Sequence, residues 1–254
     1  MGYRRDLGDR ELNNRDANRR DLSGRDLKDF LISRNYVTPW IKLDYSDQDL
    51  FIANASIISV ARRELLFRQG EMNDNIYIVR TGRFRIFLID NTGREKCLFI
   101  AEKGSMIGEV SALDRKPNYA SAYAIKNSTL FRIHIDDFMN ICDMDSEMSL
   151  MAMKSLSYKI RLISSGRDYS TKSATVRVAA PLLALCARYG SEHRDGVRLT
   201  IRFTHEELAN LADLNRVTVT RIFQKLVLEN AISFDSGYLV VRRPDYLKGL
   251  IEGE

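Results

Sequence analysis

Cysteine, histidine and long apolar runs are all scarce in this 254-residue sequence. The three cysteines, Cys97, Cys142 and Cys186, lie far apart and are odd in number, which predicts neither a disulfide framework nor a metal motif. The three histidines are equally scattered and none precedes His134, so zinc or haem ligation is not expected. The longest apolar run, residues 178–187, is about half of the ~20 residues that cross a membrane.

A secretory signal is missing as well, because the N-terminus is hydrophilic, so we expect a cytoplasmic protein with no membrane partner. At 44% hydrophobic and 29% charged, the composition is that of a globular protein with a core. The net charge of +5 suits an anionic partner but is spread over the chain and locates no site. No nucleophile with a base, no phosphate-cradling glycine loop and no carboxylate cluster stands out, so we do not expect an enzyme.

The N-terminal region repeats Arg-Asp-Leu and close variants with a period of five over residues 5–27. In a helix, five residues advance by about 500°, so the repeated leucines would form no apolar stripe. We expect residues 1–34 to be a charged, pentapeptide-like extension that is weakly ordered. A partner-binding arm and a short local structure remain as alternatives.

Short β-rich runs separated by turn residues follow, and they predict an antiparallel β-roll over residues 35–143. Residues 144–170 contain no proline, and no glycine before Gly166, which predicts one long helix. Its apolar residues have the spacing of a coiled-coil seam, so we expect a dimer interface, the alternative being a stripe packed on its own domain. The predicted interface residues are Met153, Leu156, Ile160 and Ile163.

Residues 171–254 predict a winged helix-turn-helix. Thr204 and Glu207 have the spacing of a capping box, a second helix follows from Arg216 to about residue 229, and a hairpin turns at residues 235–237. Between Leu214 and Leu228 the second helix carries three cations and no acids, as a recognition helix in the major groove would. The predicted DNA-binding residues are Thr204, Arg216, Val217, Thr218, Thr220, Arg221 and Lys225.

These motifs resemble the cyclic AMP receptor protein and FNR family of transcription regulators. The resemblance rests on Asn215 to Arg221 in the second helix, on Phe67 to Glu71 with Tyr77 to Gly82 in the β-roll, and on Gly108-Glu109. It implies an α+β fold with an N-terminal cyclic-nucleotide-binding-like jelly roll, a long dimerisation helix and a C-terminal winged helix-turn-helix. It also implies a homodimer that binds an approximately palindromic DNA site, with RNA polymerase as a partner.

The departures from the family pattern concern the effector. Cyclic nucleotide sensors of this family place an Arg about eleven residues after the loop glycine, where this chain has Tyr119. Without that cation a buried phosphate would lose its strongest contact, so we expect a small aromatic or apolar effector. The predicted effector-binding residues are Tyr77, Gly108, Glu109, Tyr119, Ala120, Ser121, Ile163 and Ser164.

Two branches of the family are disfavoured, because residues 1–96 contain no cysteine for an iron–sulfur centre and no haem ligand is evident. Val217 stands where the family commonly has a Glu that binds cytosine, and the Val-Thr-Val run is similar to the halorespiration branch, which responds to chlorinated phenols. Two alternatives remain. One is a cyclic-nucleotide-responsive regulator, and the other is an effector-gated regulatory subunit whose winged helix binds protein.

Overall fold

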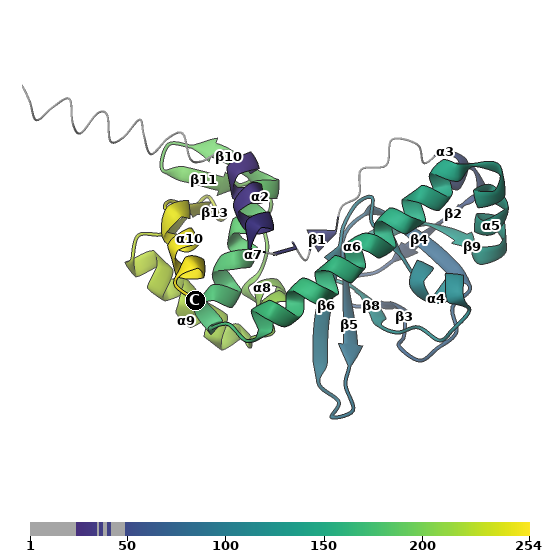
Figure 1. Cartoon of the computed structure of the whole chain (residues 1–254), viewed down its shortest axis with the longest axis horizontal. Coiled ribbons are helices and arrows are strands. Elements are labelled where there is room, and N and C mark those ends of the chain that lie inside the picture. Colours follow the sequence, from purple (N-terminus) through teal and green to yellow (C-terminus); the bar gives the residue numbers. More distant parts are fainter. Residues whose placement is uncertain (1–23, 35, 38–39, 42–48) are drawn as a thin grey trace, which may run out of the picture. The chain divides into compact units, whose positions relative to one another are not determined.

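The computed structural model describes residues 24–34, 36–37, 40–41 and 49–254, which form two compact units (Figure 1). One unit is the β-roll with most of the long helix and contains the described residues between 40 and 166, and the other combines the described residues between 24 and 37 with residues 167–254. The structure confirms the predicted order of β-roll, long helix and winged helix-turn-helix. Among the residues described, no helix is both long and apolar enough to span a membrane.

Two sheets form the β-roll, one with the strand order β1-β6-β5-β8-β3 and one with the order β2-β9-β4-β7. All pairings are antiparallel except the short parallel pair of β1 and β6. The strands are β1 (Trp40–Ile41), β2 (Ser56–Val60), β3 (Leu65–Phe67), β4 (Asn75–Thr81), β5 (Phe84–Ile89), β6 (Glu95–Ala101), β7 (Met106–Ile107), β8 (Ser121–Ala124) and β9 (Ser128–His134).

Helices cover the four-stranded sheet and share its core. They are α3 (Asp49–Asn54), α4 (Glu109–Asp114), α5 (Ile135–Met144) and the first half of α6 (Ser146–Ser170). Phe51, Ile78 and Phe138 are each at most 1% exposed and belong to one apolar cluster with Met148 and Met151 of α6. Burial of this apolar surface is what holds α6 against the roll.

The long helix begins at Ser146 instead of residue 144, because Asp145 adopts an extended conformation and separates α5 from α6. The N–H of Asp145 donates to the carbonyl of Ile141 and so closes the last turn of α5. Asp145 also accepts a hydrogen bond from the N–H of Glu147 at 2.9 Å, which caps the start of α6.

The second unit packs helices on one antiparallel sheet with the order β10-β11-β13-β12. The central helix, α7, is buried along most of its length, from Val176 to Cys186. The elements are α7 (Ala174–Tyr189), β10 (Gly190–His193), β11 (Gly196–Leu199), α8 (His205–Ala212), α9 (Arg216–Leu228), β12 (Ile232–Asp235), β13 (Tyr238–Val241) and α10 (Pro244–Glu252).

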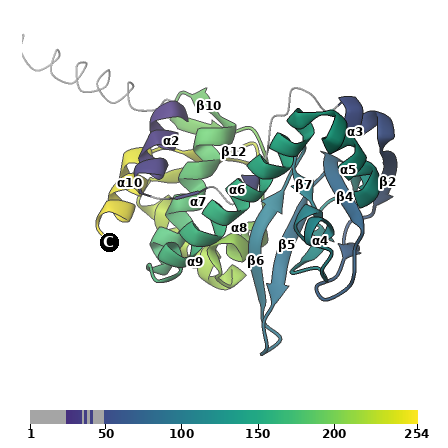
Figure 2. The ribbon, with the colours of Figure 1, turned by 45° about the vertical axis from the view of Figure 1, so that its right-hand side comes forward.

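An N-terminal helix, α2 (Gly24–Ser33), packs on α7 in this second unit (Figure 2). Leu27 and Leu31 are 1% and 5% exposed, and Arg34 lies 3.3 Å from Glu252 of α10. The prediction of a weakly ordered extension is therefore wrong for residues 24–33, while residues 1–23 lie outside the described part. The five-residue repeat does not predict this helix. Leu27, Phe30 and Leu31, which are buried or half-buried, have the three- and four-residue spacing of one helix face, and this spacing begins only at the last residue of the repeat.

Candidate DNA interface and effector site

The helix-turn-helix is built by local hydrogen bonds that end α8 and start α9. The hydroxyl of Thr204 accepts from the N–H of Glu207, whose carboxylate accepts in turn from the N–H of Thr204, so the predicted capping box is present. Asp213 ends α8 in the left-handed conformation at φ 50°, and the Arg177 guanidinium donates to its carbonyl at 2.6 Å. The side chain of Asn215 then accepts from the N–H of Thr218 at 2.8 Å and starts α9.

Helix α9 has one buried face and one cationic face. Val219, Ile222, Phe223 and Leu226 are buried against the rest of the unit. Most of the predicted DNA-binding residues of α9 are exposed, namely Arg216, Val217, Arg221 and Lys225, whereas Thr218 and Thr220 are half-buried. The first turn contains no acid, so the positive end of the helix dipole is not compensated there. Such a helix can contact an anionic duplex and its base edges.

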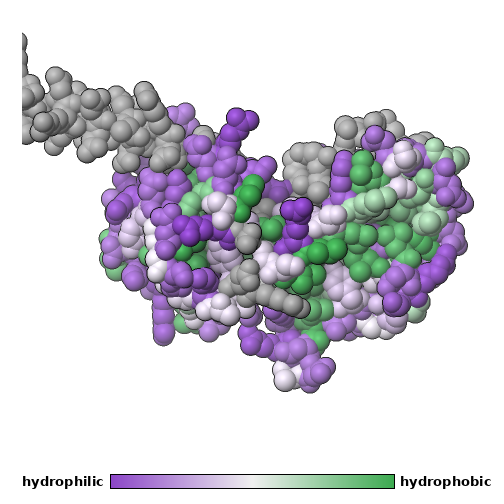
Figure 3. Space-filling model, in the orientation of Figure 1, coloured by the Kyte–Doolittle hydropathy of each residue, from purple (hydrophilic) through white to green (hydrophobic). Residues whose placement is uncertain are grey.

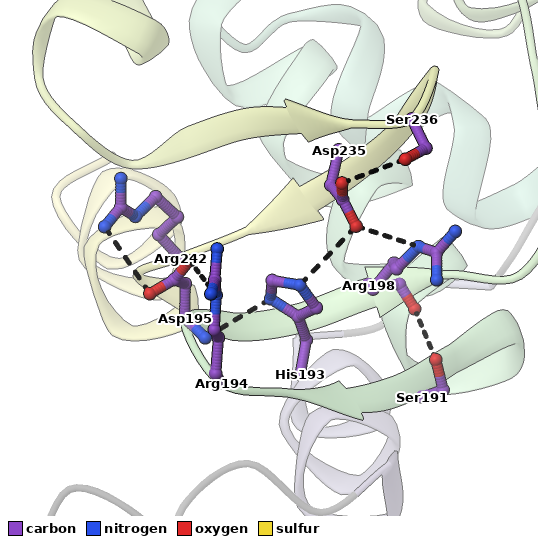
Figure 4. Close-up of polar contacts among 8 residues, drawn as sticks. All are labelled: Ser191, His193, Arg194, Asp195, Arg198, Asp235, Ser236 and Arg242. Carbon is purple, nitrogen blue, oxygen red and sulfur yellow. Dashed lines mark hydrogen bonds and ion pairs between the residues drawn. The ribbon is translucent and has the colours of Figure 1, made fainter.

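Beside the helix-turn-helix, charged side chains link the strands of the four-stranded sheet β10-β11-β13-β12 (Figure 4). Asp235 of β12 lies 3.7 Å from His193 Nε2 of β10 and 3.8 Å from Arg198 Nε of β11. Asp195 lies 3.5 Å from Arg194 and 3.9 Å from Arg242. These pairs join both hairpins of the four-stranded sheet, and Arg194, whose side chain is 87% exposed, adds a cation at the turn between β10 and β11.

In the β-roll, the predicted effector residue Glu109 is fully buried at the start of α4. It follows Gly108, whose φ of 87° and close approach to Asn75 exclude a side chain. One carboxylate oxygen, Oε1, accepts from the Ser155 hydroxyl at 2.8 Å and from the Lys159 ammonium, both on α6. Lys159, 4% exposed, also donates to the carbonyl of Met106 at 3.1 Å. A charged pair thus lies where the sequence predicted the effector.

Of the two predicted tyrosines, Tyr119 lies near the Glu109 carboxylate and Tyr77 lies beside Gly108. Burial and, to a lesser extent, the charge of Glu109 raise the pKa of Tyr119, so its phenol stays protonated. Burial also raises the pKa of Tyr77, an effect that Arg132 partly offsets. The hydroxyl of Tyr77 donates its one proton to the side-chain oxygen of Asn73 at 3.2 Å, so this proton is not available to an effector.

Some polar atoms in this region are buried without a hydrogen-bond partner in the described part of the chain. They are Oε2 of Glu109 and both side-chain amide atoms of Asn118, the residue before Tyr119. An unsatisfied buried polar atom is costly, and in native proteins it often marks a place where a ligand or water binds.

Not every predicted effector residue lies in this region. Ala120 and Ser121 are buried, but Ile163 and Ser164 are exposed. The side chains that α6 directs to Glu109 are instead Ser155 and Lys159, which sequence reasoning missed together with Asn118. A sequence signal for them exists: Ser155 and Lys159 are four residues apart and share the helix face of Met148 and Met151, which is the face that packs on the roll.

A separate open hollow of about 720 Å³ lies elsewhere on the roll and contains none of the predicted effector residues. Its lining is rich in charge, with the Arg85 guanidinium 4.4 Å from the Phe87 ring. The lining residues are Arg63, Glu64, Leu65, Arg68, Arg85, Phe87, Glu95 and Tyr123. We assign it no part in effector binding, because two of its arginines, Arg68 and Arg85, already form ion pairs with Glu71 and Glu95.

Three of the four predicted dimer residues are exposed on α6. Met153, Ile160 and Ile163 are 59%, 66% and 42% exposed, and Leu156 is half-buried. In Figure 3 hydrophobic residues gather over α6 on the face shown. Leu150, 42% exposed, extends the stripe by nearly one turn. Exposed apolar residues in a row mark an interaction surface more often than isolated ones do.

The fold and these surfaces define a DNA-binding protein with a winged helix-turn-helix and a β-roll of the sensor type. Residues 57–145 match the cyclic nucleotide-binding domain and residues 176–250 match the Crp-like helix-turn-helix domain. The chain is 27% identical to the anaerobic regulatory protein of Bacillus subtilis over 83% of this chain and 91% of that protein. It is 28% identical to the cyclic AMP receptor protein of Thermus thermophilus over 74% of this chain and 84% of that protein.

A solved structure of CprK in complex with OCPA superimposes with a TM-score of 0.68 at 18% identity, over 82% of this chain and 97% of CprK. At this identity the likeness shows the fold alone. From the two domains and the curated relatives together, the chain belongs to the cyclic AMP receptor protein/FNR family and is a DNA-binding transcription regulator.

Proposed function

We propose that the chain acts as a homodimer that binds an approximately palindromic DNA site in response to a small effector, with RNA polymerase as its partner at promoters. The observation that carries the proposal is α9, whose exposed face holds Arg216, Val217, Arg221 and Lys225 and which contains no acid between Arg216 and Leu228. Two copies related by a twofold axis would place two such helices about one helical turn apart on the duplex.

Selection from random duplex DNA tests this function. We expect an enriched palindrome whose half-sites are about 10 base pairs apart, centre to centre. The rival, a regulatory subunit whose winged helix binds protein, predicts no enriched sequence. An unenriched pool would therefore favour the rival and contradict the proposed function.

Arg221→Ala should weaken specific binding by roughly 1–3 kcal/mol, because a bidentate contact from arginine to guanine would be lost. Fluorescence anisotropy on the selected duplex measures the change. Arg62→Ala, which removes an exposed arginine from the β-roll, is the matched control. Equal affinity of the Arg221 variant and the native protein would remove Arg221 from the set of base readers.

Val217→Glu should move the preferred half-site toward a C·G pair, because a carboxylate accepts a hydrogen bond from the cytosine amino group and valine does not. Val217 is 60% exposed, so the new side chain has room. A second round of selection with the variant reads out the preference. An unaltered consensus would contradict the assignment of Val217 to base contact.

The homodimer rests on the apolar stripe of α6. Ile160→Glu should raise the dimer dissociation constant at least about a hundredfold, because burial of each isoleucine is worth about 1.5–3 kcal/mol and the dimer contains two. Analytical ultracentrifugation measures the constant. Lys154→Glu, at an exposed position on the same helix, is the control. A dimer of native strength in the Ile160 variant would place the interface elsewhere.

We propose that the effector binds beside Glu109 and is aromatic or apolar with one hydrogen-bond donor. The donor would satisfy Oε2 of Glu109, which has no partner in the described part of the chain, and the neighbouring rings of Tyr119 and Phe99 suit an apolar body. Lys159 does not provide a free cation for a phosphate, because Glu109 and the Met106 carbonyl already bind it. This is the reason we rank a cyclic nucleotide second.

A thermal-shift screen with nucleotides, haloaromatics and other small metabolites identifies the class. The effector should raise both the melting temperature and the affinity for the selected duplex, because a ligand shifts an equilibrium only by its differential affinity for the two states. If a cyclic nucleotide were the only compound to raise both quantities, the result would favour the alternative, a cyclic-nucleotide-responsive regulator, over an aromatic or apolar effector.

A further inference from the structure

His205, the first residue of α8, contacts the recognition helix at one of the predicted base readers. Its Nδ1 lies 3.0 Å from the hydroxyl oxygen of Thr220. The same hydroxyl lies 2.9 Å from the carbonyl oxygen of Arg216, one turn earlier in α9. The ring packs on Phe223 with the centroids 4.6 Å apart, which fixes the orientation of the imidazole.

Counting protons determines the direction of these two hydrogen bonds. Burial and the charge of Arg216 hold the pKa of His205 below its usual range, so at pH 7 the ring is neutral and carries one N–H. A carbonyl oxygen only accepts, so the single proton of the Thr220 hydroxyl goes to Arg216. The proton at the other contact must then come from His205 Nδ1. The reverse assignment would leave the Thr220 and Arg216 oxygens facing each other at 2.9 Å without a proton between them.

This arrangement limits what Thr220 can offer to DNA. Its hydroxyl has no proton left to donate to thymine O4, guanine O6 or a purine N7. Thr220 is half-buried, so its methyl group is the part of the side chain left to contact a base. The side chain of Val217, three residues earlier and 60% exposed, lies on the neighbouring part of the same helix surface. Two apolar groups at this spacing match the methyl group of thymine, the one apolar feature in the major groove.

We propose that His205 is a positioning residue. Its N–H donates to the Thr220 hydroxyl oxygen and so holds the rotamer in which the hydroxyl proton goes to the Arg216 carbonyl and the methyl group of Thr220, with Val217, reads thymine methyl groups. The inference rests on the proposed function, because it requires that α9 read bases. It assigns no DNA contact to His205 itself.

The direct test replaces the thymines of the selected half-site by uracil, one position at a time, which removes only the methyl group. At the position that Thr220 reads, uracil should lower the affinity about fourfold per half-site, the factor that corresponds to about 0.8 kcal/mol for one buried methyl group. The ratio of the two dissociation constants is the readout, so a variant that binds all DNA more weakly is still informative.

Variants separate the positioning role from a general effect on folding. His205→Phe keeps a ring on Phe223 but removes the donor, and the thymine-to-uracil ratio should fall toward one. His205→Asn puts an amide N–H near the place of Nδ1 and should restore the ratio. Thr220→Ser keeps the hydroxyl but lacks the methyl group and should also bring the ratio to one. His134→Phe, the same exchange in the β-roll, is the matched control and should keep the native ratio.

The outcomes distinguish this inference from the proposed function. A selection without an enriched duplex would overturn both. An enriched site at which no thymine is sensitive to uracil would leave the proposed function intact and overturn the methyl reading. A native ratio in the His205→Phe variant would show that Thr220 is positioned without His205, and would overturn the role proposed for the histidine.

Discussion

Replacement of Lys159 by methionine should destabilise the β-roll by about 3–5 kcal/mol, because it leaves the carboxylate of Glu109 buried without its counter-charge. Glu109 is 0% exposed and Lys159 is 4% exposed, so water cannot take the place of the ammonium group. Ser155 would remain as the one donor to the carboxylate among the described residues. Urea unfolding followed by tyrosine fluorescence measures the loss as a lower midpoint.

The double variant Glu109→Gln with Lys159→Met is the control that separates the effect of the unpaired charge from the effect of packing. When both charges are removed, most of the lost stability should return, because the desolvation penalty disappears together with the attraction. A double variant as unstable as the single one would show that the loss comes from packing of the Lys159 side chain, for example against Phe99, 5.4 Å from the ammonium nitrogen.

A second large effect is expected in the other unit. Leu27→Ala in α2 should cost about 2–5 kcal/mol, the range for truncating a buried leucine. Leu27 is 1% exposed and lies on α7, the central helix of the unit that binds DNA. Because the two units can unfold separately, the loss should be followed by hydrogen exchange of the α7 amides, which become less protected as local opening becomes easier.

Ile32→Ala provides the matched control on the same helix. Ile32 is 59% exposed, so truncation should change the exchange of α7 by no more than a few tenths of a kcal/mol. Unchanged protection of α7 in the Leu27 variant would mean that α2 lies on the unit without stabilising it.

The sequence was sufficient where the signal is local. Turn residues and β-rich runs predicted β4, β5, β6, β8 and β9 of the roll, though not its other strands β1, β2, β3 and β7, and the capping box at Thr204 and Glu207 predicted the start of α8. The buried face of α9 followed from the spacing of Val219, Ile222, Phe223 and Leu226. In each case the spacing alone determines which side chains share a face.

The misses share a physical cause, which is that the partner of a side chain lies far away in the sequence. Lys159 looks like an ordinary polar residue of a helix until the fold places Glu109 beside it. Ile163 and Ser164 were predicted to line the effector site from the long helix, and both are exposed, whereas Ser155 and Lys159 are the residues of α6 that contact Glu109. The docking of α2 could not be predicted, because the apolar face of α7 that receives it is not distinguishable in the sequence from the face that packs on α8.

The position of α2 has a consequence for the order in which the protein is made. The helix ends at Ser33, whereas α7, which covers its leucines, begins at Ala174. On the ribosome, Leu27 and Leu31 therefore lack their packing partner while the whole β-roll is synthesised. The core of the unit that binds DNA is complete only after α7 has been made and packs on α2. This closure is a long-range event, so it belongs to the slow, late part of folding.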